Sequence, residues 1–182
     1  MSTLKVNSII PVAGVPTGGG GGIIQVKSVV KTDVFTSTST SFVDITGMSV
    51  SITPTSNTSK ILVIAQCAVS GEDAGTGIIL DRDGTEPLTA DANGSRQRFT
   101  MIGFYAASDR ENRYGNGANH ISFLDSPATT SQVTYKLRAK TRSSSTFYVN
   151  QTRHTGDDTN GSVGTSTLTV MEVSAWLLPC II

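Results

Sequence analysis

The chain has 182 residues, which is enough for one hydrophobic core, and we interpret it as one domain with an arm. Only 15% of the residues are charged, against about 25% in a typical soluble domain, and the formal net charge is zero. This composition offers no basic surface for nucleic acid. No window reaches the apolar length of a membrane span, so we expect neither nucleic-acid binding nor membrane insertion.

The first 22 residues differ from everything that follows. Their apolar positions include Leu4, Val6, Ile9 and Ile10, and a run of glycines occupies 18–22. Consecutive glycines lose the most backbone entropy on ordering and have no side chains to pack, so this run is typical of a hinge. A tethered apolar segment predicts an extended N-terminal docking arm over residues 1–22 and a folded domain over residues 23–182.

After the glycines, apolar and hydroxyl residues alternate with a period of two, which predicts β-strands. The expected strands are 24–30, 42–52, 61–69, 77–81, 98–105, 121–124, 133–139, 146–150 and 167–175. The segment 61–69 is apolar on both faces, which is typical of a central strand. The apolar parity switches at Gly47, where we expect a bulge, and Asp83 with Gly84 predicts a hairpin turn.

The spacing of these strands favours an all-β fold, an antiparallel β-sandwich that is jelly-roll-like, over repeated βαβ units. Strands rich in threonine and valine with few charges leave edges open to further pairing. The run 176–182 is almost wholly apolar, which is typical of an interface. We therefore expect a homo-oligomer, and the alternative is that this run packs into the chain's own core.

The two cysteines, Cys67 and Cys180, both lie among apolar residues. We interpret each as a small buried hydrophobe, while a disulfide between them stays open because two distant cysteines carry no spacing signal.

No pattern in the sequence predicts catalysis. Neither His120 nor His154 has a carboxylate or cysteine at ligand spacing, so we expect no metal site within one chain. The acidic segments 81–86 and 157–160 do not follow a calcium-binding loop and are interpreted as solvated turns. No nucleophile motif places a serine for attack, so we expect no catalytic residues and no cofactor.

Long polar loops provide the candidates for recognition. Their basic and aromatic residues are Arg96, Arg98, Tyr105, Arg110, Arg113 and Tyr114. Arginine and aromatic side chains supply planar hydrogen bonding and large contact area, which suits binding to carbohydrate or protein. The alternative interpretation is an ordinary solvated loop.

Four segments carry a resemblance to a known group of proteins. They are residues 2–10 (STLKVNSII), 42–54 (FVDITGMSVSITP), 123–130 (FLDSPATT) and 166–173 (STLTVMEV). In these segments the chain resembles tail fibres and related virion structural proteins of tailed bacteriophages, especially marine and cyanobacterial phages. The resemblance touches most of the chain, and its motifs are structural and not catalytic.

This resemblance implies a virion protein, assembled in the bacterial host cytoplasm, that forms a homotrimer. The leader would attach it to other virion proteins, and the β-domain would face a host-surface glycan or protein. The chain has no collagen-like or coiled-coil shaft, so a capsid decoration protein that binds neighbouring capsid subunits is the alternative. A particle-borne glycan hydrolase is a third hypothesis.

Overall fold

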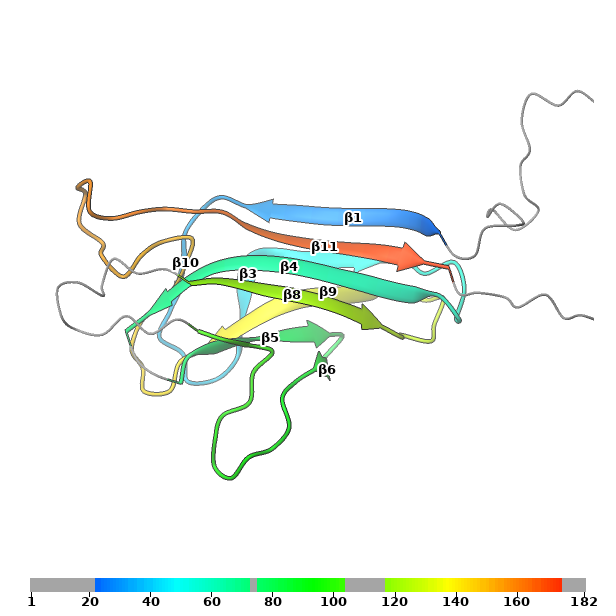
Figure 1. Cartoon of the computed structure of the whole chain (residues 1–182), viewed down its shortest axis with the longest axis horizontal. Coiled ribbons are helices and arrows are strands. Elements are labelled where there is room, and N and C mark those ends of the chain that lie inside the picture. Colours follow the sequence, from blue (N-terminus) through cyan, green and yellow to red (C-terminus); the bar gives the residue numbers. More distant parts are fainter. Residues whose placement is uncertain (1–21, 73–74, 104–116, 175–182) are drawn as a thin grey trace, which may run out of the picture.

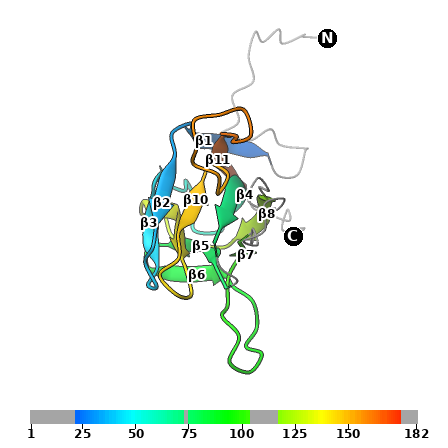
Figure 2. The same ribbon diagram turned by 90° about the vertical axis from the view of Figure 1, so that its left-hand side faces the viewer.

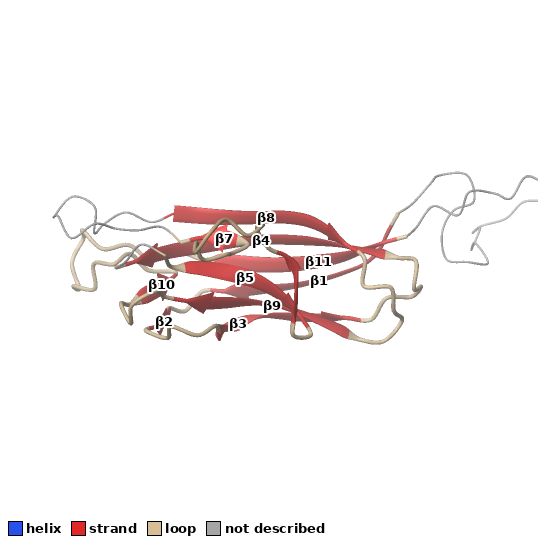
Figure 3. Cartoon of the chain, turned by 90° about the horizontal axis from the view of Figure 1, so that it is seen from below, coloured by secondary structure: helices blue, strands red, loops and turns tan. Residues whose placement is uncertain are grey.

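The computed structural model describes residues 22–72, 75–103 and 117–174, and within these residues the chain is built of strands and loops (Figure 3). The strands are β1 (Ile23–Lys31), β2 (Phe35–Ser37), β3 (Val43–Ile52), β4 (Lys60–Gly71), β5 (Gly77–Arg82), β6 (Thr85–Leu88), β7 (Met101–Ile102), β8 (Gly117–Asp125), β9 (Val133–Lys140), β10 (Phe147–Val149) and β11 (Ser166–Val173). All of their pairings are antiparallel.

The strands form two sheets, which we name sheet A and sheet B (Figures 1 and 2). Sheet A has the order β1-β11-β4-β10-β2, and β8 also pairs with β4. The short strands β10 and β2 continue the lines of β11 and β1, because β11 pairs with residues 60–66 of β4 and β10 with residues 69–71. Sheet B has the order β3-β9-β5-β6, with β7 beside the same strand, β5.

This connectivity is that of a jelly roll. Each sheet is four strands wide once the collinear pairs β1/β2, β10/β11 and β6/β7 are each counted as one strand. Numbered along the chain, the eight positions then follow the order 1-8-3-6 in sheet A and 2-7-4-5 in sheet B. Two packed sheets with this double Greek-key order define the jelly-roll fold, so the predicted all-β sandwich is confirmed.

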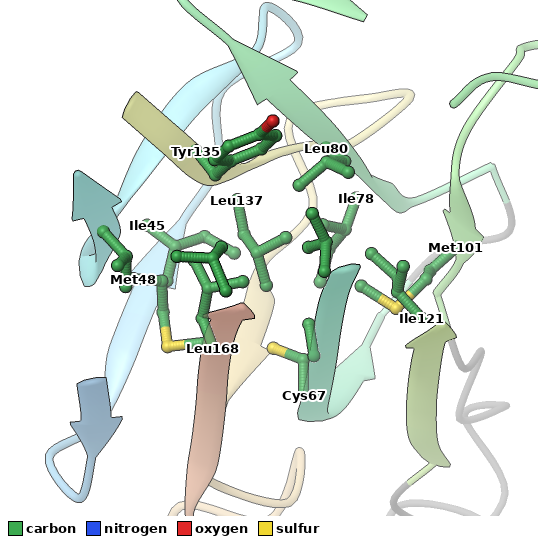
Figure 4. Packing of buried hydrophobic residues seen from close by; sticks show 14 of the residues in the cluster. Ile45, Met48, Cys67, Ile78, Leu80, Met101, Ile121, Tyr135, Leu137 and Leu168 are labelled. Atoms are coloured by element: carbon green, nitrogen blue, oxygen red, sulfur yellow. The ribbon is translucent and has the colours of Figure 1, made fainter. Parts of the chain in front are cut away.

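The core lies between the two sheets and follows directly from the period-two pattern. Alternate residues of β4 (Ile61, Val63, Ala65, Cys67 and Val69) are fully buried. They face the alternate residues of β9, including Tyr135 and Leu137, together with the apolar residues of β3 and β5 (Figure 4). Burial of these side chains is the main stabilising term of the fold, at roughly 1.5–3 kcal/mol for each large aliphatic or aromatic side chain.

Three local predictions are confirmed. The register of β3 against β9 shifts between Asp44 and Ser49, and Gly47 within this interval has a φ of 84°. Asp83 and Gly84 join β5 to β6 with φ angles of 49° and 85°, as a type I′ hairpin turn requires. Strand β4 pairs on both sides, as expected of a central strand.

One strand prediction is too long. Of the expected strand 98–105, the described part is strand only at Met101–Ile102. Thr100 explains where the pairing stops: its hydroxyl accepts from the Leu80 amide and donates to the Leu88 carbonyl, and so occupies groups that a longer ladder would use. The remaining residues, 104 and 105, lie outside the described residues.

The sandwich has two distinct ends. At one end, which we name the exit end, the chain enters β1 and leaves β11: the Ser174 amide donates to the Gly22 carbonyl at 3.0 Å, and the Gly22 amide donates to the Ser174 hydroxyl at 2.9 Å. The turns 53–59 and 126–132 lie at this end. The opposite, far end carries the segments 32–42, 141–146 and 150–165, at the left in Figure 1.

Candidate functional site

The first described recognition candidates, Arg96 and Arg98, lie in the loop between β6 and β7, and both are exposed. The Arg96 guanidinium donates to Asn93 Oδ1 at 3.0 Å, and Arg98 Nε donates to the Ala90 carbonyl. Each arginine therefore stabilises the conformation of its own loop. Each contact uses one nitrogen of the guanidinium, and the side chain as a whole remains exposed.

Arg96 also lines an open pocket at the far end, with a volume of about 310 Å³. The lining residues are Gly75, Ser95, Arg96, Gln97, Phe99, Ile102 and Arg142. Gly75 precedes β5 and Arg142 follows β9, so the pocket joins two strand ends of sheet B to the loop that carries Arg96. Arg98 is not among the lining residues.

The apolar wall of this pocket exists because residue 77 is a glycine. The Phe99 ring lies directly on Gly77, and a Cβ atom at that position would be 2.4 Å from the ring. Phe42 meets Phe99 edge to face, with ring centroids 6.0 Å apart. Phe99 is only 7% exposed, so packing against Gly77 and Phe42 holds this wall in place.

The charges around the pocket are positive. Lys140 Nζ lies 4.7 Å from the centroid of Phe42 and 5.6 Å from that of Phe99, in cation–π geometry. Arg96 and Arg142 are exposed at the pocket itself. Guanidinium groups beside a rigid aromatic wall, with the amide of Gln97, suit an anionic or hydroxyl-rich ligand.

Four of the predicted recognition residues (Tyr105, Arg110, Arg113 and Tyr114) lie outside the described residues, as do the arm residues Leu4, Val6, Ile9 and Ile10. Sequence reasoning missed Phe99, Gln97 and Arg142. Phe99 adjoins the predicted residues, but its partner Gly77 is 22 positions away, and no local pattern connects Arg142 with Arg96.

His154 has a carboxylate neighbour in the structure. Its Nε2 lies 2.9 Å from Asp158 Oδ2, four residues further along, a contact that the sequence analysis did not predict. The Asp158 carboxylate also accepts from the Asn160 amide, and these hydrogen bonds lower the pKa of Asp158. Asp157 and Asn160 are exposed, as expected of a solvated turn. Among the residues that the structure describes, no three His, Cys, Asp or Glu side chains gather as metal ligands do.

Cys67 is buried in the core as a free thiol, as the interpretation as a small hydrophobe predicts. Burial raises the pKa of this thiol to about 11, so it remains protonated at neutral pH. Cys180 lies outside the described residues.

Two buried carboxylates hold the exit end. Asp125 of β8 accepts hydrogen bonds from the Tyr135 hydroxyl and the Arg82 guanidinium, and so connects sheet A to sheet B. Burial and the hydrogen bond to Asp125 both raise the pKa of Tyr135. The second carboxylate, Glu172 of β11, is fully buried and accepts from the Thr55 amide and hydroxyl and from Gln25 Nε2. These contacts fix the position at which the chain enters and leaves the domain.

No protein-family model matches the chain, and no curated protein matches it. Among solved structures, a chain of the "Structure of infectious bursal disease virus Gt strain" is similar to it, with a TM-score of 0.37 and 11% sequence identity. That match covers 93% of this chain and 44% of the other, so this chain spans less than half the length of that neighbour. Within the described residues there is no helix of the length and apolarity needed to cross a membrane.

Proposed function

We propose that this chain is a structural protein of a bacteriophage virion, a short trimeric tail fibre or appendage. Residues 1–22 dock it on other virion proteins, and the jelly roll presents its far end to the host surface. The proposal is non-enzymatic. It rests first on the resemblance of residues 2–10, 42–54, 123–130 and 166–173 to phage fibre and virion proteins, and the jelly roll supports it because viral capsid and lectin domains use this topology.

The observation that carries the proposal is the separation of the two ends. The leader joins the domain at Gly22 on the exit end, while the pocket with Arg96 and Arg142 lies at the far end. Strand β4 has twelve residues and is about 40 Å long at the rise of a strand. It spans most of the distance between the two ends. An attachment segment and a recognition surface at opposite ends suit a protein that bridges a particle and a cell.

Locating the chain on the particle tests this proposal. Antibody raised against residues 23–182 and labelled with gold should mark the tail in electron micrographs. A particle whose label covers the capsid lattice would instead support the second candidate, a capsid decoration protein, which the jelly-roll topology also favours. A chain without residues 1–22 should fold and fail to join particles, and its incorporation would refute the docking role.

Recognition at the far end has its own test. Full-length protein should compete with phage for host cells, and Arg96→Ala or Arg142→Ala should weaken this competition by about 10-fold. Arg98→Ala is the matched control, because it removes one exposed cation from the same loop and does not line the pocket. Equal competition by all three variants would refute the pocket as the contact. Release of reducing sugar from host polysaccharide would refute the non-enzymatic assignment.

A further inference from the structure

The outer face of sheet A carries almost no charge. Strand register places its outward residues in rows across β1, β11, β4 and β8: Val26, Met171, Leu62 and Leu124; then Ser28, Thr169, Ile64 and Ser122; then Val30, Thr167, Gln66 and His120. We name the first row, which lies near the exit end, the apolar band. Val26 and Leu124, at its two edges, are 51% and 53% exposed. Lys60, beyond the band, is the one charged residue that the register of β1, β11, β4 and β8 places on this face within the described residues. Glu72 and Arg153 lie beside Tyr148 of β10, at the far end of the sheet.

Sheet B presents the opposite chemistry to solvent. On its outer face Asp44 pairs with Lys136 and with Arg138, each at 2.9 Å, and Arg138 also lies 3.4 Å from Asp81. The two sheets thus bury similar apolar residues on their inner faces and differ on their outer faces. Depletion of charge distinguishes the centre of a protein interface from ordinary surface. Sheet A has this property and sheet B does not.

The edge of sheet A at β1 is also unpaired within the described residues. Strand β1 has nine residues and pairs with β11 along one side, and no described strand pairs with its other side. Of the eight exposed large hydrophobic residues in the described part of the chain, five (Ile23, Ile24, Val26, Val30 and Val34) lie on β1 or the turn after it. Soluble proteins protect long edge strands with charges, proline or coverage. Here Lys27 is the one exposed charge on the strand.

We infer that the outer face of sheet A, with the edge of β1, is a self-association surface that a second copy of this chain covers. The inference rests on the proposed trimer and deepens it by assigning the face that joins the copies. A sheet of four strands and nine residues has an area of about 570 Å² in projection, so the face and its edge together approach the roughly 800 Å² per partner of a standard interface.

A copy of the same chain suits this face for two reasons. Its polar residues are mainly serine and threonine, whose hydroxyl groups both donate and accept and can therefore pair with their own kind. Its near absence of charge, in a chain with zero formal net charge, removes the repulsion that would oppose association of identical surfaces. A strongly charged partner such as nucleic acid would find only Lys60 and Lys27 as complementary groups here.

The test uses the full chain and light scattering coupled to size-exclusion chromatography. Wild type should run as an oligomer at micromolar concentration, and Val26→Lys should raise the dissociation constant about 100-fold or more, because it places an unpaired charge in the interface. Thr46→Lys is the control: Thr46 is exposed on β3 of sheet B, and a lysine there should leave the oligomer intact. Circular dichroism establishes that both variants fold.

A monomeric wild type at 100 µM (about the highest useful concentration) would overturn the inference, and so would dissociation by Thr46→Lys with none by Val26→Lys. The other possible occupant of the apolar band is the chain's own residues 175–182. In that case wild type would be monomeric and a chain ending at Ser174 would associate, which also overturns the inference. A monomer that still labels phage tails would refute this surface and leave the virion assignment standing. An oligomer that is absent from particles would support this surface and refute the virion assignment.

Discussion

Replacing the buried carboxylate Glu172 with glutamine should destabilise the domain by about 2 kcal/mol. Thr55 donates twice to Glu172 Oε1, at 2.7 Å from both its amide and its hydroxyl, and Gln25 Nε2 donates to Oε2 at 2.6 Å. In Glu172→Gln the amide oxygen must face Thr55, since the Thr55 backbone amide cannot reverse. These two bonds persist as bonds to a neutral acceptor, each weaker by about 1 kcal/mol than a bond to a carboxylate.

The NH2 group of the new glutamine then faces the side-chain amide of Gln25. Gln25 Nε2 also donates to the Thr53 carbonyl at 2.6 Å, so a flip of its amide to accept from the new NH2 group sacrifices that bond. Loss of the buried charge offsets part of these costs, because burial on its own raises the pKa of Glu172. The hydrogen bonds from Gln25 and Thr55 outweigh burial, and the pKa is lowered overall. The ionised form is therefore the one that stabilises the fold.

Urea unfolding followed by circular dichroism measures this effect, and a loss of 2 kcal/mol corresponds to about 4–8 °C in melting temperature for a domain of this size. Since the folded pKa is below the ordinary value of 4.5, the contribution is complete above that pH and is lost as the pH falls through the folded pKa. The gap between wild type and Glu172→Gln should therefore close in acid. Glu86→Gln, at an exposed position on β6, is the matched control. Equal stability of the two variants at pH 7, or a gap that widens in acid, would refute the reasoning.

Three further predictions concern the interior. Gly77→Ala should destabilise the domain by about 1–3 kcal/mol, because its Cβ would press into the Phe99 ring; unfolding in urea equal to wild type would contradict this. Cys67 should resist iodoacetamide in the native protein at pH 8 and react on unfolding in urea, and rapid native alkylation would show that the thiol is accessible. Asn150 has a φ of 62° and donates to the carbonyls of Lys31 and Asp33, so Asn150→Ala should cost more stability than Asn150→Gly by about 1 kcal/mol, a difference that melting curves can measure.

The sequence predicted the fold through features that are local. The period-two alternation marks strands because it states which face of each strand is buried, and Asp83–Gly84 and Gly47 mark a turn and a bulge because only certain residues accept a positive φ. Pairing across the sheets is not local. Thr100 ends one ladder by bonding to Leu80 and Leu88, and nothing in the neighbouring sequence indicates this.

The candidate site was predicted only in part for the same reason. Arg96 was identified by its residue type in a long loop, whereas Arg142 reaches the same pocket from just after the C-terminal end of β9. The uncharged face of sheet A was equally hidden, because Val26, Met171 and Leu62 become neighbours only when the strand order is known. Strand order in a jelly roll joins the first strand to the last, which a reading along the chain does not reveal.

That union of β1 with β11 has a mechanical consequence. A pull on the chain at Gly22, resisted at the far end, acts along the axis of β1, which pairs with β11 from Ile23 to Lys31. Hydrogen bonds between antiparallel strands lie perpendicular to this direction, so the load is in shear and all of them bear it together. Peeling the bonds apart one by one would require a force across the strand. The domain should therefore transmit tension applied at Gly22 without unravelling from its first strand.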